Sequence, residues 1–143
     1  MMPVAVVVGV GPGIGKAVAL KFAKEGYSVA LVARNINKLE PIKQEIEALT
    51  TGQKVACFPS DASDEKSVKG AYKAITSQLG VPSVLIYNAA ARRLIVQGIC
   101  DVSTEEFINF WKINCLGAFF WSREVLPGSY YHITGLNQLF VKK

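Results

Sequence analysis

Cysteine and histidine are scarce in this sequence, and their spacing excludes several kinds of site. There are 3 cysteines, Cys57, Cys100 and Cys115, and the single histidine is His132. No CxxC pair and no cluster of cysteine with histidine occurs, so a metal site is not expected. Widely spaced thiols of odd number fit a protein kept reduced, and the localisation we predict is cytoplasmic.

Clustered positive charge and long apolar runs are also missing. The net charge is +5, but the only adjacent basic pairs are Arg92-Arg93 and Lys142-Lys143. Nucleic-acid binding needs a basic face, so lysines scattered over helix surfaces explain the charge better. The opening run Val4–Val8 is too short to span a bilayer and lacks the basic start of a signal peptide. We therefore expect neither a nucleic-acid partner nor a membrane.

Short apolar runs alternate with amphipathic segments along the chain. The runs at residues 4–8, 27–33, 54–59 and 84–87 are continuous, which is typical of parallel strands covered on both faces. The segment after the first run has the helical period, with Ile14, Val18 and Phe22 on one face. Strands joined by crossover helices predict an α/β fold, a doubly wound parallel sheet of about four strands.

Three further segments have the helical period. Pro41 lies inside the second predicted helix, so this helix is kinked or starts again there. The third starts near Asp64 and ends at Gly80, and the last starts at the capping box of Ser103 and Glu106. Their apolar stripes are Ile36, Leu39, Ile42, Ile46 and Leu49; Val68, Tyr72, Ile75 and Leu79; and Phe107, Phe110, Trp111, Asn114, Ala118, Trp121 and Val125.

The most informative motif is the glycine-rich run Gly9-Val10-Gly11-Pro12-Gly13-Ile14-Gly15, between the first strand and the first helix. A phosphate needs close backbone N–H groups and the positive end of a helix dipole. Glycines supply the tight turn and remove the Cβ atoms that would block a pyrophosphate. The position of the run predicts a dinucleotide site, although glycine can serve such a turn for structural reasons alone.

The second strand ends in Val32-Ala33-Arg34-Asn35, with a basic residue at the position that selects between two cofactors. An acidic residue there would bind the ribose hydroxyls of NAD and repel a 2′-phosphate. An arginine can instead meet that phosphate with two hydrogen bonds. We therefore predict NADP (NADPH) rather than NAD. The alternative is a solvated arginine near the start of a helix.

The glycine spacing Gly9-x-x-x-Gly13-x-Gly15 resembles the GxxxGxG pattern of the short-chain dehydrogenase/reductase family. Tyr87-Asn88-Ala89-Ala90 is similar to that family's Asn-Asn-Ala-Gly motif, from which it departs at Tyr87 and Ala90. The resemblance implies the first part of a Rossmann-like domain over residues 1–127, with residues 128–143 as a divergent tail. It also implies hydride transfer between NADP and a carbonyl or alcohol.

The resemblance assigns roles to single residues. Asp61 would contact the adenine, whereas its sequence position alone fits equally well a cap on the next helix. Asn114 occupies the position of the family's catalytic asparagine, which holds a water in the proton relay; the alternative is a structural asparagine bonded to backbone. The implied cofactor-binding residues are Gly9, Gly11, Gly13, Ile14, Gly15, Arg34, Asp61, Ala62, Asn88, Ala89 and Ala90.

The family's catalytic tyrosine and lysine, spaced Tyr-x-x-x-Lys, have no counterpart in this sequence. The residues four positions after its tyrosines are Leu31, Thr76, Ala91, Thr134 and Gly135. We therefore expect an inactive, truncated member of the family. The alternatives are a non-catalytic NADP-binding module, paired with a copy or a relative through helix 103–126 or an open sheet edge, and a glycine-rich loop with a purely structural role.

Overall fold

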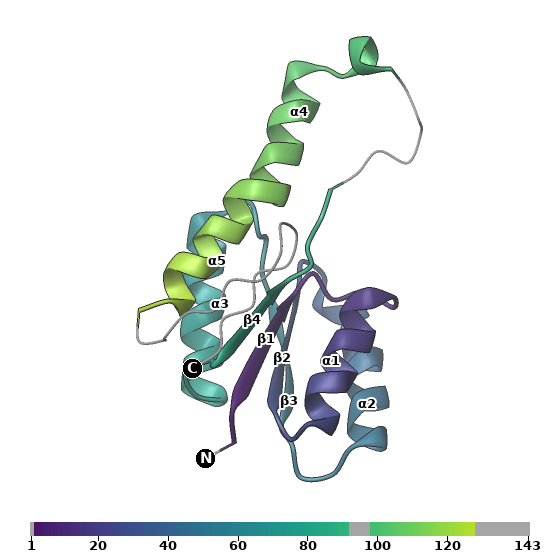
Figure 1. Cartoon of the computed structure of the whole chain (residues 1–143), viewed down its shortest axis with the longest axis vertical. Coiled ribbons are helices and arrows are strands. Elements are labelled where there is room, and N and C mark those ends of the chain that lie inside the picture. The colour runs from purple at the N-terminus through teal and green to yellow at the C-terminus, as the bar shows by residue number, and fades with distance from the viewer. Residues whose placement is uncertain (1, 92–97, 128–143) are drawn as a thin grey trace.

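A four-stranded parallel sheet in the order β3-β2-β1-β4 forms the centre of the protein (Figure 1). The computed structural model describes residues 2–91 and 98–127. The predicted α/β class and the Rossmann-like sheet are confirmed, because all pairings are parallel and the strand order requires crossover connections. The strands are β1 Val4–Val8, β2 Ser28–Ala33, β3 Val55–Pro59 and β4 Val84–Tyr87.

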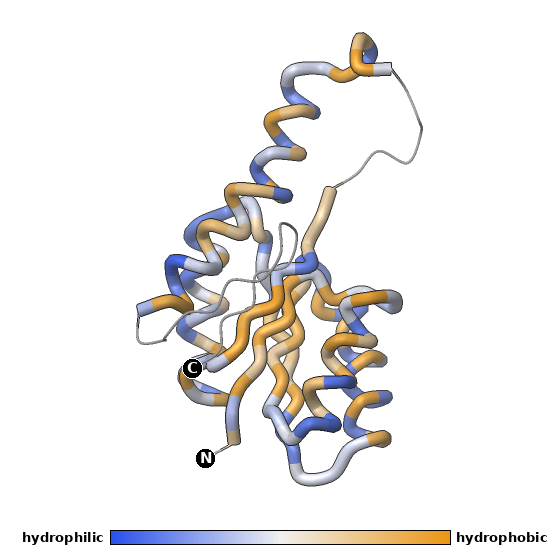
Figure 2. Tube along the Cα trace, viewed as in Figure 1, coloured by the Kyte–Doolittle hydropathy of each residue, from blue (hydrophilic) through white to orange (hydrophobic). Residues whose placement is uncertain are grey.

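Helices cover both faces of the sheet. On one face lie α1 Ile14–Lys24 and α2 Glu40–Leu49, and on the other lie α3 Glu65–Gln78 and α5 Gly117–Val125 (Figure 1). Neighbouring strand residues point to opposite faces, so Ala5 and Val7 pack beneath α1 while Val6 and Val8 face α3 and α5. The strands are therefore predominantly apolar, as Figure 2 shows, with Ser28 at the start of β2 as a buried polar residue.

Helix α1 buries a different face from the one we predicted. Its buried residues are Gly15, Ala19 and Ala23, whereas Ile14 is 66% exposed and Val18 and Phe22 are only partly buried. The prediction weighted residue size, but small side chains let the helix axis approach the sheet closely. The larger side chains lie along the flank of the helix.

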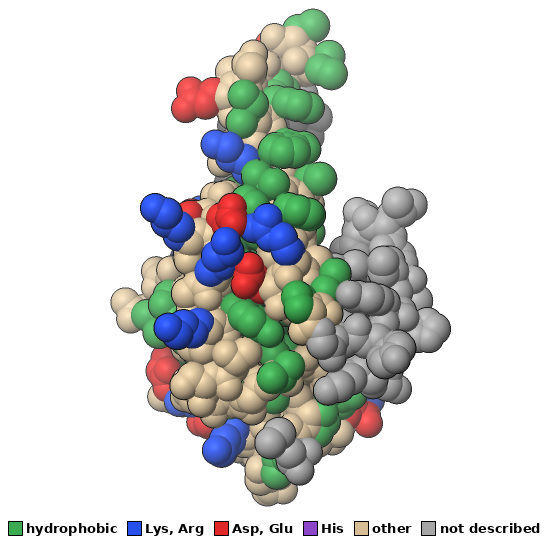
Figure 3. Space-filling view, turned by 90° about the vertical axis from the view of Figure 1, so that its left-hand side faces the viewer, with side chains coloured by type: hydrophobic (Ala, Val, Ile, Leu, Met, Phe, Trp, Pro, Cys, Tyr) green, Lys and Arg blue, Asp and Glu red, His purple; other side chains and the backbone are tan. Residues whose placement is uncertain are grey.

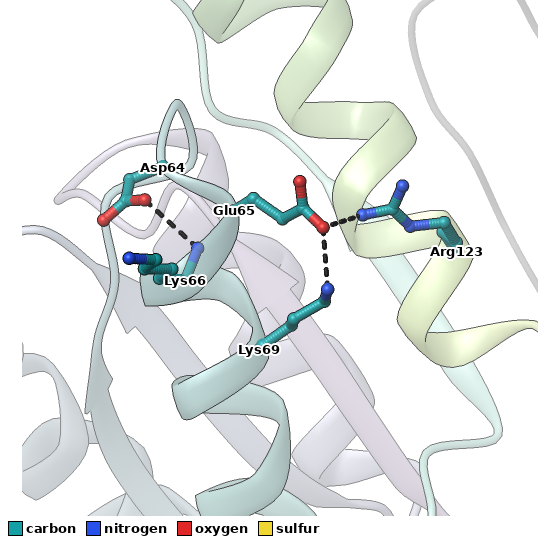
Figure 4. A network of polar contacts seen from close by, with 5 residues as sticks. All are labelled: Asp64, Glu65, Lys66, Lys69 and Arg123. Atoms are coloured by element: carbon teal, nitrogen blue, oxygen red, sulfur yellow. Dashed lines mark hydrogen bonds and ion pairs between the residues drawn. The ribbon is translucent and has the colours of Figure 1, made fainter.

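Helices α2 and α3 follow their predictions more closely. A 3₁₀ turn, Ile36–Lys38, precedes α2, and Pro41 stands in the first turn of that helix, so the restarted helix is the correct alternative. Asp64 caps α3 by accepting a hydrogen bond from the Lys66 N–H at 3.1 Å (Figure 4). Of the predicted stripes, Tyr72 and Leu79 are partly buried, and Ile36 and Leu49 at the ends are exposed. The buried members are Leu39, Ile42, Ile46, Val68 and Ile75.

The last predicted helix is continuous in direction but changes type along its length. After a 3₁₀ turn at Ile99–Asp101 come α4 Thr104–Trp111, a π-helical turn Lys112–Leu116 and α5 Gly117–Val125. The capping box of Ser103 and Glu106 is present. Helix α4 projects beyond the sheet and has no buried residue, whereas α5 packs on the sheet (Figure 1).

The aromatic residues of this helix divide between surface and core. Trp111 and Phe119 are exposed, as expected for a helix that lacks a covering partner. Phe120 and Trp121, in contrast, are buried against β4 and α3, and Trp121 is 0% exposed. Helix α5 thus completes the core of this face.

An exposed ion-pair network joins α3 to α5 (Figure 4). The Glu65 carboxylate accepts hydrogen bonds from Arg123 Nη2 at 2.5 Å and forms an ion pair with Lys69 Nζ at 2.7 Å. The Arg123 guanidinium also lies 5.1 Å from the centre of the Phe119 ring. Exposed pairs contribute little to stability, so burial of the apolar side chains holds the two helices together.

The predicted tail at residues 128–143 and the basic pair Arg92-Arg93 lie outside the described residues. No helix among residues 2–91 and 98–127 is both long and apolar enough to cross a membrane.

Replacing Trp121 by alanine is expected to destabilise the fold by about 3–5 kcal/mol, because it removes a fully buried indole and leaves a cavity. The free energy of unfolding, measured by urea denaturation followed by circular dichroism, checks this. Phe119→Ala, on the exposed side of the same helix, is the matched control and should change stability by less than about 1 kcal/mol. Equal losses in both variants would contradict the packing of α5.

Candidate functional site

Most of the candidate residues gather at one edge of the sheet. The strands are parallel and in register, so their carboxyl ends Val8, Ala33, Pro59 and Tyr87 lie on the same side. The glycine-rich loop, Arg34, Asp61 and Asn88 follow these ends directly. This is the edge at which doubly wound sheets bind their ligands.

Gly9 begins the loop and is required by the structure itself. Its φ of +88° is a conformation that other residues rarely adopt. A Cβ at this position would lie 2.7 Å from the Asn88 carbonyl carbon and closer still to the backbone of Ala89. The Gly9 N–H donates to the Val32 carbonyl at 2.9 Å, which fixes the start of the loop over β2.

The other glycines of the loop divide into two kinds. A Cβ on Gly15 would lie 2.7 Å from the Gly9 carbonyl oxygen, so the packing of α1 against the loop explains this residue. Cβ atoms on Gly11 and Gly13 would meet no atom within 4 Å. A purely structural loop explains Gly9 and Gly15, but it leaves the space beside Gly11 and Gly13 open.

That open space faces the start of α1. Gly13 is the N-cap of the helix, so no side chain caps the first turn, and this turn contains no acidic residue. The Lys16 N–H already donates to the Gly11 carbonyl at 3.0 Å, whereas the N–H groups that precede it have no partner within the helix. These groups and the positive end of the helix dipole lie beside the open space. The arrangement has the features that a bound pyrophosphate needs, and the residues present fit such a group.

Arg34 and Asp61 are neighbours at the ends of β2 and β3. Burial by itself raises the pKa of the Asp61 carboxyl, but hydrogen bonds from Ser63 and the charge of Arg34 outweigh it, so the pKa is below its usual value. Asp61 Oδ1 accepts from the Ser63 N–H at 2.9 Å and from the Ser63 hydroxyl at 2.7 Å. Asp61 therefore stabilises its own turn, and Asp64 rather than Asp61 caps α3.

Asn88 links β4 to the glycine-rich loop. Its side-chain Nδ2 donates to the Gly9 carbonyl at 2.9 Å, and its backbone N–H donates to the Val8 carbonyl at 2.8 Å. The next residue, Ala89, provides the backbone against which Gly9 packs, while Ala90 is exposed. The loop and the end of β4 are thus one unit.

Asn114 is exposed, which corrects our placement of this residue within a buried apolar stripe. It lies in the π-helical turn, which rotates the residues that follow relative to an unbroken α-helix. Its Oδ1 accepts from the Ala91 N–H at 2.9 Å and its Nδ2 donates to the Ala91 carbonyl at 3.0 Å. The structure therefore brings Asn114 to the segment after β4 through backbone contacts.

Tyr87 makes a contact with the last helix that the sequence did not predict. The Tyr87 side chain is 6% exposed, and its hydroxyl donates to the Ile113 carbonyl. Burial, together with the charges of Asp61 and Cys115, raises the pKa of this phenol, so it stays protonated. We treated Tyr87 only as a departure from a motif, although Gly117, a glycine inside an apolar helix, was a signal that another side chain needs room there.

No group of side chains suited to a metal ion occurs in the described part of the chain, residues 2–91 and 98–127. The sheet order, the glycine-rich loop and the residues at the strand ends are those of a dinucleotide-binding oxidoreductase domain. The sequence model described as short chain dehydrogenase matches residues 3–135, and the chain belongs to this family.

Similar proteins agree with this assignment. Glycine betaine reductase of Emericella nidulans is 36% identical over 125 residues, 87% of this chain and 10% of the relative. The NADPH-dependent reductase BacG of Bacillus subtilis is 38% identical over 84 residues, 59% of this chain and 32% of the relative. The solved structure of L-sorbose reductase from Gluconobacter frateurii with NADPH and L-sorbose has a TM-score of 0.81 and 28% identity, covering 89% of this chain and 47% of that one. The chain thus spans about half or less of the proteins it matches.

Alanine substitutions at two glycines of the loop are expected to differ sharply in stability. Gly9→Ala combines a positive φ with contacts to backbone atoms that cannot move aside, and should cost about 3 kcal/mol or more. Gly11→Ala enters open space and should change the free energy of unfolding by less than about 0.5 kcal/mol. Urea denaturation of both variants checks this. A large loss in Gly11→Ala would show that the loop is packed more closely than described.

Proposed function

We propose that this chain is an NADP-preferring cofactor-binding portion of a short-chain dehydrogenase/reductase. The observation that carries the proposal is the open space beside Gly11 and Gly13 at the start of α1, where no packing within the described residues accounts for the missing side chains. A pyrophosphate there would accept hydrogen bonds from the N–H groups of the first helical turn. Two similar proteins support the same cofactor: BacG is described as NADPH-dependent, and the structure of L-sorbose reductase contains NADPH.

The preference for NADP rests on Arg34. It follows β2 directly and is exposed, so its guanidinium can reach a 2′-phosphate. The charge of Arg34 acts on Asp61, whose carboxylate is already held by Ser63 and would by itself repel that phosphate. Arg34 therefore supplies the positive charge that makes the site favourable for NADP, and Asp61 is left to contact the adenine side.

We further propose that this chain carries out no hydride transfer on its own. None of the tyrosines in the sequence is followed by lysine at the fourth position, so no phenol has the partner that the family's proton transfer uses. Asn114 is held by the Ala91 backbone and lies at the position of the catalytic asparagine. The cofactor, when bound, would supply a hydride, while the residues described here would bind and orient it.

Titration of the purified chain with NADPH and NADH, followed by nucleotide fluorescence, tests the cofactor assignment. We expect saturable binding with NADPH bound more tightly. Arg34→Ala should weaken NADPH binding by roughly tenfold or more, since a charge-assisted contact is lost, and leave NADH binding almost unchanged. Lys24→Ala, at the far end of α1, removes the same charge and should leave both affinities unchanged.

Absence of NADPH binding by a chain that is folded by circular dichroism would refute the cofactor assignment. The same samples, mixed with ketones and aldehydes, should show no oxidation of NADPH. Turnover by this chain would refute the proposed inactivity and require a different proton donor.

A second candidate, a non-catalytic interaction module, is favoured by the exposed side chains of α4. Figure 3 shows apolar side chains along the projecting helix. Phe107, Ile108 and Trp111 of α4 are large exposed apolar residues, as is Phe119 of α5. A cavity of about 360 Å³ between α1 and β4, lined among others by Val18, Phe22 and Ile86, is a second apolar surface at the sheet edge. Surfaces of this kind are typical of subunit contacts.

The location that we propose for the protein is the cytoplasm. Its 3 cysteines are free thiols, which fit a reducing compartment.

Sedimentation velocity tests the interaction module. We expect the chain to self-associate at micromolar concentration. Phe107→Asp, which places a charge in the apolar surface of α4, should shift it to the monomer. Glu105→Gln, on the same helix, is the matched control and should leave the distribution unchanged. A wild-type chain that is monomeric at 100 μM would argue against a second copy as the partner.

A further inference from the structure

The π-helical turn at Lys112–Leu116 leaves the carbonyl of Ile113 without its usual donor. In an α-helix the Gly117 N–H would donate to Ile113, four residues earlier. Here the Gly117 N–H donates to the Lys112 carbonyl instead. The Tyr87 hydroxyl, which comes from β4, takes over as the donor to Ile113. A tyrosine of the sheet thus donates to the carbonyl that the Gly117 N–H would bind in an unbroken α-helix.

The surroundings are shaped to admit this hydroxyl. A Cβ on Gly117 would lie 2.7 Å from the Ala62 carbonyl oxygen and closer still to the Tyr87 hydroxyl, so only glycine leaves room for the tyrosine. Tyr87 is buried in the apolar cluster on the α3 and α5 face of the sheet, the cluster that also contains Trp121. Burial raises the pKa of this phenol, so the hydroxyl is protonated and able to donate at neutral pH.

The residue after Ile113 is Asn114, whose amide makes both hydrogen bonds to Ala91. An exposed amide holds two such bonds only if its backbone is fixed, because free rotation of side chain and backbone opposes them. Ala91 ends the segment that starts at Asn88, and Asn88 holds the Gly9 carbonyl at 2.9 Å. Hydrogen bonds therefore connect Tyr87 to the π turn and the π turn to Ala91. The backbone of residues 88–91 and the Asn88 side chain complete the connection to the glycine-rich loop.

We propose that Tyr87 is a positioning residue for the cofactor site. By holding the Ile113 carbonyl, its hydroxyl fixes the π turn, which aims the Asn114 amide at Ala91 and keeps residues 88–91 in place beside the glycine-rich loop. The relevance to NADP rests on the proposed function, because the segment so held would form the nicotinamide side of the site. The positioning itself is a property of the chain without any ligand.

The test is Tyr87→Phe, which removes only the hydroxyl oxygen. Two readouts are needed: the side-chain amide signals of Asn114 in ¹⁵N-correlated NMR, assigned by their loss in Asn114→Ala, and the dissociation constant of NADPH. In the wild type, the bonded Asn114 amide should give two resolved signals with slow solvent exchange. In Tyr87→Phe these should collapse toward the positions of a free amide, and NADPH should bind about fivefold more weakly.

Tyr72→Phe is the matched control, since Tyr72 is a partly buried tyrosine of α3 packed on the same core. It should leave both the Asn114 signals and NADPH affinity unchanged. A double-mutant cycle tests whether Tyr87 acts through Asn114. If it does, Tyr87→Phe should weaken NADPH binding no further when Asn114 is already alanine.

Unchanged Asn114 signals in a folded Tyr87→Phe variant would overturn the proposal, and the hydroxyl would then be a contact that serves stability alone. Altered Asn114 signals together with no NADPH binding by the wild-type chain would support the positioning role and refute the proposed cofactor. The two failures are therefore distinguishable, because the NMR readout requires no nucleotide.

Discussion

The close approach of Gly9 to the backbone of Asn88 and Ala89 is the constraint on which the rest of the site depends. It brings the turn after β1 against the end of β4, so that the loop is supported from below by the sheet and from the side by the Asn88 amide. Only a residue without a side chain and with a positive φ permits this approach. With the first residue of the loop fixed, the N–H groups at the start of α1 face a defined open space. The site is therefore formed before any ligand binds, which reduces the entropy lost on binding.

Much of the fold could be predicted because a buried parallel strand requires an uninterrupted apolar run. The strands at residues 4–8 and 84–87, the restart of α2 near Pro41 and the cap at Ser103 all follow from local rules that leave few alternatives. The buried face of α1 could not be predicted in this way. Periodicity shows which residues share a face, but the choice of Gly15, Ala19 and Ala23 over larger neighbours depends on the distance between helix and sheet, a tertiary quantity.

For the site, the glycine spacing and the positions of Arg34, Asp61 and Asn88 were predictable because strand ends meet at one edge. Which glycines are needed for packing and which leave open space could not be predicted. Gly11 and Gly15 differ only in the atoms that lie opposite them in the folded chain. The π turn was equally inaccessible: Asn114 lies in an apolar pattern that continues smoothly through the sequence. Asn114 is exposed and pairs with Ala91, and the residue before it accepts a hydrogen bond from Tyr87 of β4, contacts between segments that the pattern of the helix does not reveal.

The fit of Tyr87 beside Gly117 means that these two positions form one volume shared between strand and helix. A smaller polar residue at position 87, such as asparagine, would leave a void in the apolar cluster that also contains Trp121. A methyl group at position 117 would have no space while the tyrosine remains. The tyrosine therefore requires the glycine, and the Ala62 carbonyl excludes a Cβ at position 117 even without the tyrosine. Placing a tyrosine at the equivalent strand position of another protein would thus require a glycine in the facing helix as well.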